Sequence, residues 1–221
     1  MAVSIIVADD HPLFRSALRG TLINLEGGAQ IHEAEDLSSL QSCVEQHDQA
    51  DLILLDLHMP GADGFGALVF LMSHYAHIPV IVVSAYSEPE IMRRAMDHGA
   101  SGFLPKSSSP EVIHQALECV LAGGLWMPEG VTQSRMVTEE EQSTADAIAQ
   151  LTPQQFRVAV MVSQGLLNKQ IAFELGVTEA TIKAHMTEIF KKFGVHSRTQ
   201  VALCLNQLSV NADSNLDDFK S

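Results

Sequence analysis

Short apolar runs in the first half of the chain alternate with segments long enough to form helices. The runs occupy residues 5–8, 52–55, 80–83 and 102–104, and a weaker run occupies residues 30–34. Continuous apolar strands indicate a parallel sheet that is covered on both faces. We therefore predict β-strands that each precede a helix, in a five-stranded, doubly wound α/β domain of the flavodoxin-like kind, with strand order 2-1-3-4-5.

Residues 151–208 have a helical pattern without strand-like runs. Four helices are predicted, and the third runs from Thr178, its N-cap residue, to about Phe193. A short helix, a glycine turn and a longer helix make a helix-turn-helix. The caps, turns and starts of the other helices are assigned to Thr152 with Pro153, Gly165, Asn168, Gly176 and the region of Arg198.

The two sides of the predicted third helix differ in character. Its inward stripe is apolar at helical spacing: Ile182, Met186, Ile189, Phe190 and Phe193. Its opposite side has small residues and lysines: Ala180, Lys183, Ala184, Thr187 and Lys191. Such a surface can enter the major groove of DNA without steric or charge conflict. A four-helix module that binds only protein is the alternative interpretation.

Charge is distributed unevenly along the chain. The net charge is −14, yet residues 151–208 have six Lys and Arg against three Asp and Glu. Residues 1–128 have five Lys and Arg against sixteen Asp and Glu. One basic module in an acidic chain favours nucleic-acid contact by that module. Residues 129–150 are acidic with little apolar periodicity, and we predict a solvated, partly helical linker there.

The composition also bears on location. No run approaches the ~18–20 apolar residues that a membrane span needs. The N-terminus leads directly into an apolar run without a basic region, which predicts a first strand rather than a signal peptide. Cys43, Cys119 and Cys204 lie far apart, as is typical of reduced thiols in a cytoplasm. We therefore expect a cytoplasmic protein that makes no membrane contact.

Polar residues follow the predicted strands at one end. Asp9 and Asp10 follow the first strand, Asp56 the third, Ser84 the fourth and Lys106 the fifth. In the expected strand order, strands one and three are neighbours, and ligands bind beyond their carboxyl ends. Three carboxylates in a small space destabilise one another unless a cation compensates them. Mg²⁺ suits such oxygens, and Lys106 can meet an incoming phosphoryl group.

Two enzyme classes with comparable sheets do not fit these motifs. A haloacid-dehalogenase-like phosphohydrolase needs a second acid two residues after its nucleophile, where this chain has His58. A Rossmann oxidoreductase needs Gly-x-Gly-x-x-Gly after its first strand, where this chain has Asp-Asp-His-Pro at residues 9–12. His74 and His77 could be interpreted as metal ligands, but surface positions on a helix are the favoured interpretation.

The first part of the chain resembles the receiver domain of two-component response regulators. The resemblance covers about residues 3–122 and implies that Asp56 accepts a phosphoryl group from a histidine kinase. It also implies that Mg²⁺ is held by Asp9, Asp10, Asp56 and the backbone carbonyl of His58. The motifs that carry it are Asp9-Asp10, Asp56 with Met59-Pro60-Gly61 and Asp63-Gly64, Ser84-Ala85, and Gly-Ala-Ser-Gly-Phe-Leu-Pro-Lys at residues 99–106.

Other receiver positions receive roles from the same resemblance. Ser84 would bond a phosphoryl oxygen, Lys106 would pair with the phosphoryl group, and Phe103 occupies the switch-aromatic position. Phe103 also suits a plain core aromatic, and the two roles are compatible. His58 and Tyr86 occupy positions that flank the phosphoryl group in this family. We expect their rings to exclude the hydrolytic water and prolong the lifetime of the phosphate.

Residues 151–205 resemble the LuxR-type output domain. By position, Lys183, Ala184 and Thr187 would face bases, and a second set would face phosphates: Asn168, Lys169 and Lys191. The family's usual Pro-Arg-Glu is Pro-Gln-Gln at residues 153–155, so an ion pair and a phosphate contact of the family are absent. The matching segments are Leu151-Thr-Pro153, residues 165–172, Leu175-Gly-Val177, residues 181–192 and Arg198-Thr199.

Together the two resemblances imply a regulator of the NarL/FixJ type. Residues 1–124 would form the receiver, 125–150 a linker, 151–208 the helix-turn-helix and 209–221 a flexible tail. Phosphorylation would switch homodimerisation and binding to double-stranded promoter DNA, and RNA polymerase is a further candidate partner. Such a protein is not an enzyme, apart from its own autophosphorylation and autodephosphorylation. A receiver that controls protein contacts without sequence-specific DNA binding is the alternative.

Overall fold

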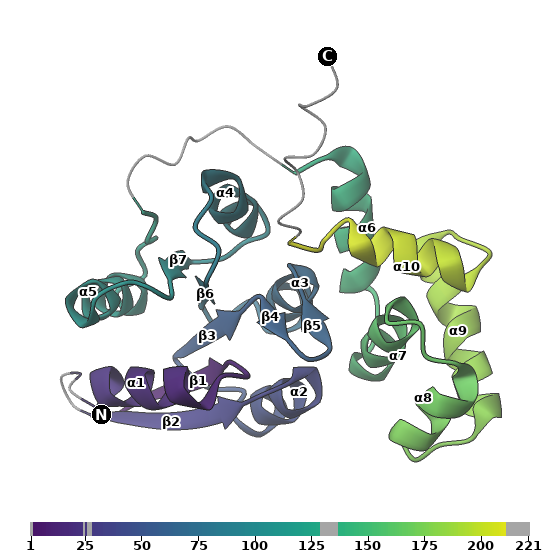
Figure 1. Cartoon of the computed structure of the whole chain (residues 1–221), viewed down its shortest axis with the longest axis horizontal. Coiled ribbons are helices and arrows are strands. Elements are labelled where there is room, and N and C mark those ends of the chain that lie inside the picture. The colour runs from purple at the N-terminus through teal and green to yellow at the C-terminus, as the bar shows by residue number, and fades with distance from the viewer. Residues whose placement is uncertain (1, 24, 26–27, 129–136, 211–221) are drawn as a thin grey trace.

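The computed structural model describes residues 2–23, 25, 28–128 and 137–210, which form two packed units (Figure 1). The first unit is built on a five-stranded parallel sheet of order β2-β1-β3-β6-β7, which confirms the predicted order. A separate two-stranded hairpin, β4 with β5, follows β3. The strands are β1 (Val3–Ala8), β2 (Ala29–Ala34), β3 (Leu52–Asp56), β4 (His58–Met59), β5 (Ala62–Asp63), β6 (Val80–Ser84) and β7 (Gly102–Pro105).

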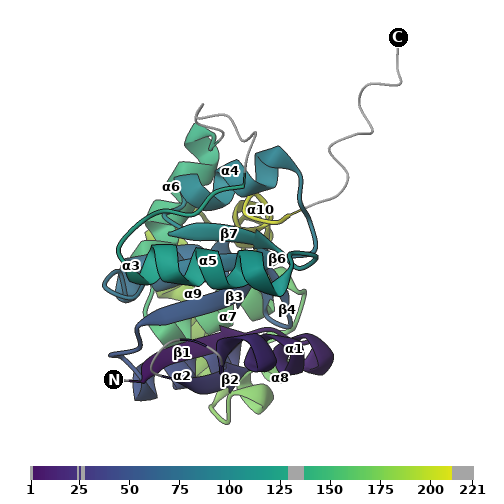
Figure 2. The same ribbon diagram turned by 90° about the vertical axis from the view of Figure 1, so that its left-hand side faces the viewer.

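Helices cover both faces of the sheet, as the continuous apolar strands predict. Because strand side chains alternate, Val7 and Leu54 pack with α1 and α5, which Figure 2 shows in front of the sheet. Ile6 and Ile53 pack on the opposite face with the other three helices. The helices are α1 (Pro12–Leu22) and α5 (Pro110–Leu121) on one face, and α2 (Leu37–Gln46), α3 (Gly66–His74) and α4 (Pro89–Asp97) on the other.

The second unit is entirely helical in its described residues. The predicted N-caps are confirmed, because the Thr152 and Thr178 hydroxyls accept the N–H groups of residues 155 and 181 at 3.3 and 3.2 Å. The prediction that Asn168 is a cap is wrong. The helix begins at Asn168, and the Gln170 side chain accepts the Leu167 N–H at 2.8 Å instead. The helices are α6 (Glu139–Ala149), α7 (Pro153–Ser163), α8 (Asn168–Glu174), α9 (Glu179–Phe193) and α10 (Arg198–Asn206).

Parts of the predicted linker are packed rather than solvated. The backbone N–H of Trp126 donates to Ser101 and its carbonyl accepts from Phe103, both at 3.0 Å, so the chain continues beside β7 after residue 124. Farther along, α6 buries Ile148 and also Glu141, which is only 4 % exposed. The neighbouring residues 139 and 140 are exposed, as a solvated segment predicts. The structure thus corrects the solvation prediction at Glu141, whose partners are Arg94 of α4 and His98 directly after it.

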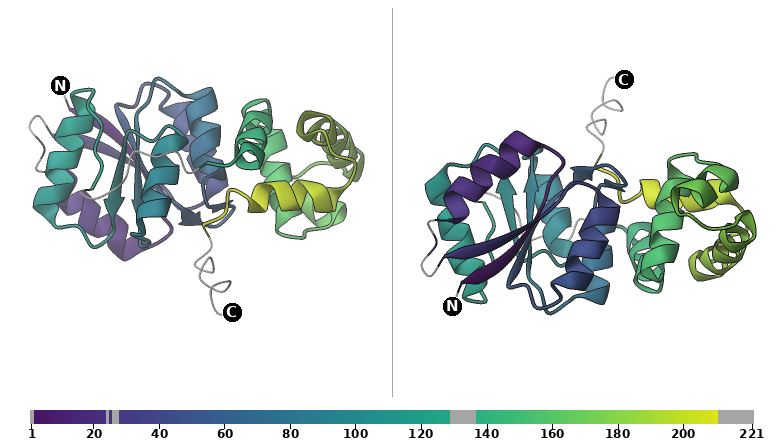
Figure 3. Two further views of the ribbon diagram at one scale, coloured as in Figure 1. Left: turned by 90° about the horizontal axis from the view of Figure 1, so that it is seen from above. Right: turned by 90° about the horizontal axis from the view of Figure 1, so that it is seen from below.

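An apolar core extends across both units, which lie side by side in Figure 3. Phe70 of α3 stacks on Phe156 of α7 with ring centroids 4.8 Å apart. The Gln41 side chain of α2 donates to the Pro153 carbonyl at 3.2 Å and accepts from Arg157 Nε at 2.9 Å. These contacts hold α7 against α2 and α3, so the receiver surface touches the start of the helix-turn-helix unit.

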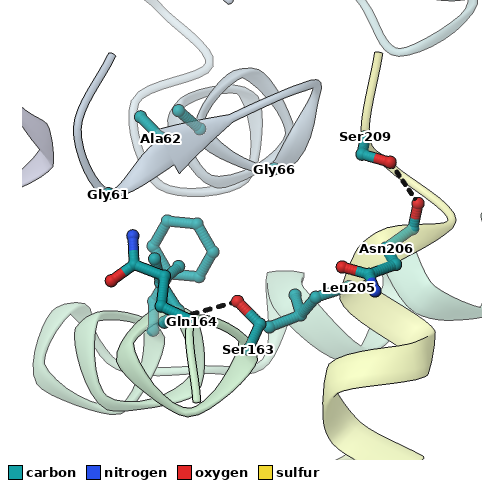
Figure 4. A pocket seen from close by; sticks show the side chains of 11 residues that line it. Gly61, Ala62, Gly66, Ser163, Gln164, Leu205, Asn206 and Ser209 are labelled. Atoms are coloured by element: carbon teal, nitrogen blue, oxygen red, sulfur yellow. Dashed lines mark hydrogen bonds between the residues drawn. The ribbon is translucent and has the colours of Figure 1, made fainter. Parts of the chain in front are cut away.

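A close backbone contact joins the end of the second unit to the β5–α3 turn. The Phe65 N–H donates to the Leu208 carbonyl at 2.7 Å. Gly64 has a φ of +76°, and a Cβ there would lie 2.1 Å from the Leu208 oxygen. Only glycine fits this position. A cavity of about 340 Å³ remains beside the contact, between α3, α7 and α10 (Figure 4).

Candidate functional site

The carboxyl ends of β1 and β3 bring three aspartates together. Asp9 and Asp10 follow β1, Asp56 ends β3, and the two strands are hydrogen-bonded neighbours. Asp9 and Asp56 are each 2 % exposed, whereas Asp10 is half-buried. One possible ligand atom from each of these residues and from His11 lies within 4.8 Å of all the others. The structure therefore confirms that the strand ends form one acidic cluster.

Lys106 supplies the positive charge of this cluster. It follows β7, and its backbone N–H donates to the Ser84 carbonyl at 2.7 Å. Its Nζ lies 2.7 Å from Asp9 Oδ2 and 2.7 Å from Asp56 Oδ2. The ring of Phe14 lies 5.0 Å from the ammonium, at a cation–π distance. Three carboxylates against one ammonium leave the site with an excess of negative charge.

Burial controls the ionisation of the site. Desolvation raises the pKa of Asp56 above its usual value, Lys106 offsets only part of that rise, and the Asp9 carboxylate adds to it. Desolvation lowers the pKa of Lys106, but its close contacts with the Asp56 and Asp9 carboxylates outweigh this, and the net shift is upward. The lysine therefore remains charged, and the carboxylates remain incompletely neutralised. An additional cation would relieve this imbalance.

The donor set fits a hard divalent cation. Asp9 Oδ2 and Asp10 Oδ1 are buried but accept no hydrogen bond of good geometry, although Lys106 and His11 lie beside them. Carboxylate oxygens of this kind suit Mg²⁺. The His58 N–H donates to Asp56 Oδ1 at 3.1 Å, whereas a metal contact of the His58 carbonyl stays a prediction. His11 was not predicted as a member of the cluster, and its only sequence signal is its place directly after Asp10.

Three further predicted residues lie around this edge of the sheet. Ser84 is fully buried at the end of β6, beside β3, and its Oγ accepts the Tyr86 N–H at 3.1 Å. Phe103 is fully buried in the core, which confirms the plain core interpretation. The rings of His58 and Tyr86 contact each other with centroids 4.8 Å apart. Their roles toward a phosphoryl group stay predictions.

Helix α9 presents the residues that were predicted to contact DNA. Lys183, Ala184, Thr187 and Lys191 are exposed, while the inward residues of the helix at 182, 186 and 189 are buried. The Thr187 hydroxyl donates to the Lys183 carbonyl at 3.0 Å. On α8, Lys169 is exposed and Asn168 is half-buried. Figure 1 shows α8 and α9 on the side away from the sheet, so the receiver leaves this surface open.

The neutral Pro-Gln-Gln segment still performs a structural role. Gln155 Oε1 accepts the Thr152 N–H at 3.1 Å and the Lys192 ammonium at 2.6 Å. Lys192 also donates to the Gln150 carbonyl at 2.8 Å. The position thus keeps a hydrogen bond to a lysine without an ion pair, and Lys192 is held against α7 rather than presented to solvent.

The two histidines that could have been metal ligands form no metal cluster in the described part of the chain. His74 is exposed, and its ring nitrogens lie 3.0 and 2.9 Å from the carbonyls of residues 70 and 151. His77 lies beyond the end of α3 and contacts the Asp48 carbonyl at 2.7 Å. The three cysteines carry free thiols. Within the described ranges, no helix could cross a membrane.

Two protein families match the two units separately. Residues 5–118 match the response regulator receiver domain, and residues 149–205 match the luxR family of bacterial regulatory proteins. The chain belongs to the NarL/FixJ family of response regulators. A two-component response regulator of this architecture controls transcription and is not a classical enzyme.

Relatives of this response regulator match it over nearly its whole length. The glycerol metabolism activator of Pseudomonas putida is 36 % identical over 214 residues, covering 94 % of this chain and 97 % of the relative. The nitrate/nitrite response regulator NarL of Escherichia coli K12 is 31 % identical over 206 residues, covering 92 % and 95 %.

A solved structure of RcsB from Salmonella enterica serovar Typhimurium, bound to promoter P1flhDC in the presence of the phosphomimetic BeF3⁻, is also similar. It is 26 % identical with a TM-score of 0.56, and the match covers 95 % of this chain and 100 % of RcsB.

Proposed function

We propose that Asp56 of this response regulator accepts a phosphoryl group from the phosphohistidine of a kinase. The acyl phosphate then promotes homodimerisation and binding to double-stranded promoter DNA. The observation that carries this proposal is the contact of one ammonium, Lys106, with two buried carboxylates, Asp9 and Asp56, at 2.7 Å each. In this arrangement Lys106 neutralises only part of the carboxylate charge, and its ammonium can move from Asp56 to a phosphoryl oxygen.

The transfer is a displacement at phosphorus. A carboxylate oxygen of Asp56 attacks, the P–N bond to the kinase histidine breaks, and the released imidazole nitrogen takes up a proton. Lys106 moves to a phosphoryl oxygen while Asp9 keeps it at the site. Asp9, Asp10, Asp56 and the His58 carbonyl would hold Mg²⁺, which would neutralise part of the charge of the phosphoryl group. A small phosphodonor in place of the kinase gives autophosphorylation, and attack by water restores Asp56.

The effect of phosphorylation is then transmitted to the second unit through Ser84 and α4, while the phosphoryl group stays on Asp56. The Ser84 hydroxyl donates to a phosphoryl oxygen, which changes its present contact with the Tyr86 N–H. Tyr86 leads into α4. Arg94 of α4 and its C-cap residue His98 both contact Glu141 of α6, at 2.9 and 2.7 Å. A shift of α4 therefore changes the partners of a buried carboxylate in the other unit. Phe103, buried between the sheet and the helices of that face, acts as the switch aromatic.

The DNA-binding surface consists of the exposed residues of α9 with the start of α8. Lys183, Ala184 and Thr187 face base edges, and Asn168, Lys169 and Lys191 face phosphates. Exposure of α9 supports this assignment, and so does the binding of the similar RcsB to a promoter. Few basic residues are available in one chain, so two chains are needed for tight binding to half-sites ~10 bp apart. RNA polymerase contact and a cytoplasmic location belong to the same proposal.

To test the proposal, the full chain is first used to select a DNA duplex from a random pool. Its affinity for that duplex is then measured. Acetyl phosphate with Mg²⁺ should tighten wild-type binding by about tenfold, a change of ~1.4 kcal/mol. The Asp56→Asn chain should not respond, and Lys183→Ala should bind weakly with or without the phosphodonor. An equal response from Asp56→Asn would refute the phosphoacceptor assignment. Failure to select any duplex would favour the receiver that controls protein contacts alone.

A further inference from the structure

His11 directs an imidazole nitrogen into the acidic cluster. Its Nδ1 lies 2.6 Å from Asp10 Oδ1 and 3.3 Å from Asp9 Oδ1. The ligand atoms of His11 and of the aspartates at 9, 10 and 56 are mutually within 4.8 Å. This spacing allows one ion to contact a nitrogen and several oxygens together. The histidine side chain is 64 % exposed, so an ion can reach it from solvent.

The backbone holds His11 in this position without using its ring. His11 is the N-cap residue of α1, but its side chain makes no capping hydrogen bond. Its backbone N–H donates to Asp9 Oδ1 at 2.8 Å, which ties the residue to the cluster. Pro12 at the first helical position fixes the chain direction after it. The imidazole therefore takes no part in capping α1, and its Nδ1 faces the carboxylates of Asp10 and Asp9.

The aspartate oxygens provide an independent indication that an ion belongs here. Asp9 is 2 % exposed, and its Oδ2 accepts no hydrogen bond although Lys106 lies nearby. Asp10 Oδ1 is likewise buried without an accepted hydrogen bond, beside His11. Three carboxylates, one ammonium and one divalent ion sum to zero charge. A neutral imidazole adds a donor atom to that set without changing the balance.

We propose that His11 Nδ1 is a side-chain ligand of the metal ion and biases the site toward divalent transition-metal ions. Carboxylate and carbonyl oxygens suit Mg²⁺, whereas imidazole nitrogen suits ions such as Zn²⁺ and contributes less to Mg²⁺. This inference rests on the metal site of the proposed function and deepens it. The identity of the bound ion then depends on one residue that directly follows the aspartate pair.

Competition titrations of the full chain with Mg²⁺, Mn²⁺ and Zn²⁺ test the proposal. Because most sites bind Zn²⁺ more tightly than Mg²⁺, the informative quantity is the change in that preference when the ligand is removed. His11→Ala should weaken Mn²⁺ and Zn²⁺ binding by about tenfold or more and change Mg²⁺ binding less than about twofold. Asp10→Asn should weaken the binding of all three ions.

His77→Ala is the matched control for the loss of a histidine. His77 is exposed, and its ring contacts the Asp48 carbonyl rather than the cluster. The control should bind all three ions as the wild type does. An equal loss for Mg²⁺ and Zn²⁺ in His11→Ala would refute a ligand role that discriminates between ions. A gain for every ion would also refute it, because His11 would then be a competitor for Asp10.

Electron paramagnetic resonance of bound Mn²⁺ gives a second measurement. With ¹⁵N-labelled histidine, the wild type should show magnetic coupling of Mn²⁺ to one nitrogen, and His11→Ala should lose it. Absence of the coupling in the wild type contradicts the proposal. Mg²⁺-dependent phosphorylation of Asp56 is measured in parallel on the wild type and on His77→Ala, so failure of this inference can be distinguished from failure of the proposed function.

Discussion

Two buried charged clusters, one within the receiver unit and one between the two units, differ in how well their charges are matched. The phosphoacceptor cluster, named for its proposed role, consists of Asp9, Asp56 and Lys106. It has two buried carboxylates on one ammonium, and Asp10 lies close by. The interdomain cluster, Arg94, Glu141 and His98, has one carboxylate between a guanidinium and an imidazole. The first cluster has more negative than positive charge and would be stabilised by a further cation. The carboxylate of the second cluster already has two partners. Excess charge therefore separates the reactive site from the structural one.

The pKa shifts of the two clusters have opposite directions. Burial raises the pKa of Asp56, and Lys106 does not fully offset it. Burial alone would also raise the pKa of Glu141, but hydrogen bonds from His98 and Arg94 outweigh it and the net shift is downward. Burial thus accompanies opposite net pKa shifts, because only Glu141 has enough cationic and hydrogen-bonding partners to outweigh desolvation. A comparably buried carboxylate is a functional candidate only where its partners are too few.

The largest expected effect comes from breaking the interdomain cluster. Glu141→Ala leaves Arg94 and His98 without their shared acceptor, and Arg94 keeps its bond to the Gln207 carbonyl at 2.9 Å. We expect a loss of about 3 kcal/mol in the free energy of unfolding. Urea denaturation of the full chain measures it. The exposed neighbour provides the control, since Glu140→Ala should change stability by less than ~0.5 kcal/mol.

The second effect concerns metal and should appear at one cluster only. Mg²⁺ at about one hundred times its dissociation constant should stabilise the wild type by ~2.7 kcal/mol. Mg²⁺ should stabilise Glu141→Gln as much as the wild type, because we expect no ion to bind at the interdomain cluster. Asp56→Asn should gain clearly less, since one oxygen ligand has been replaced by an amide. Thermal unfolding with and without Mg²⁺ checks this, and equal gains for all three chains would contradict the comparison.

The third effect concerns the lifetime of the phosphate. The rings of His58 and Tyr86 touch beside the phosphoacceptor cluster, and we expect them to exclude the attacking water. Replacing them together, His58→Asn with Tyr86→Glu, should accelerate dephosphorylation about tenfold, equivalent to ~1.4 kcal/mol in the barrier. The measurement is the first-order loss of phosphate from purified protein without kinase. Equal decay constants would show that the two side chains do not gate the water.

The smallest effect is a difference in the slope of stability against pH. The pKa of Glu141 is depressed on folding, so its stabilising contribution is present above its unfolded pKa and is lost as pH falls. The pKa of Asp56 is raised, so its ionisation costs stability as pH rises above the unfolded value. As pH rises from about 3 to 6 in metal-free buffer, the free energy of unfolding of the wild type should increase relative to that of Glu141→Gln. It should decrease relative to that of Asp56→Asn. Parallel slopes for both differences would refute the opposite shifts.

The amino-acid sequence predicts the phosphoacceptor cluster better than the interdomain cluster for a physical reason. Asp9, Asp56 and Lys106 each follow an apolar strand, and parallel strands bring their carboxyl ends to one edge. The burial of Glu141 depends instead on Arg94, 47 residues away on a helix whose packing no local pattern reveals. For that reason the burial of Glu141, within a segment predicted to be solvated, could not be read from the sequence.

Local competition explains the smaller errors. Asn168 is a good capping residue by type, but Gln170 reaches the Leu167 N–H and the helix begins one position earlier. The direction of the His11 ring was not predicted, because it depends on the backbone bond to Asp9. The helix-turn-helix was predictable in its caps at Thr152 and Thr178 and in its apolar stripe. Its contact with α2 and α3 was not, since it depends on Phe156 meeting Phe70.

The central claim is that the cluster with excess negative charge receives the phosphoryl group. Intact-mass spectrometry after incubation with acetyl phosphate and Mg²⁺ tests it most directly, using wild type, Asp56→Asn and Glu141→Gln. The account predicts one added phosphoryl group on wild type and on Glu141→Gln, none on Asp56→Asn, and loss of the label when the metal is chelated beforehand. Undiminished labelling of Asp56→Asn would contradict it.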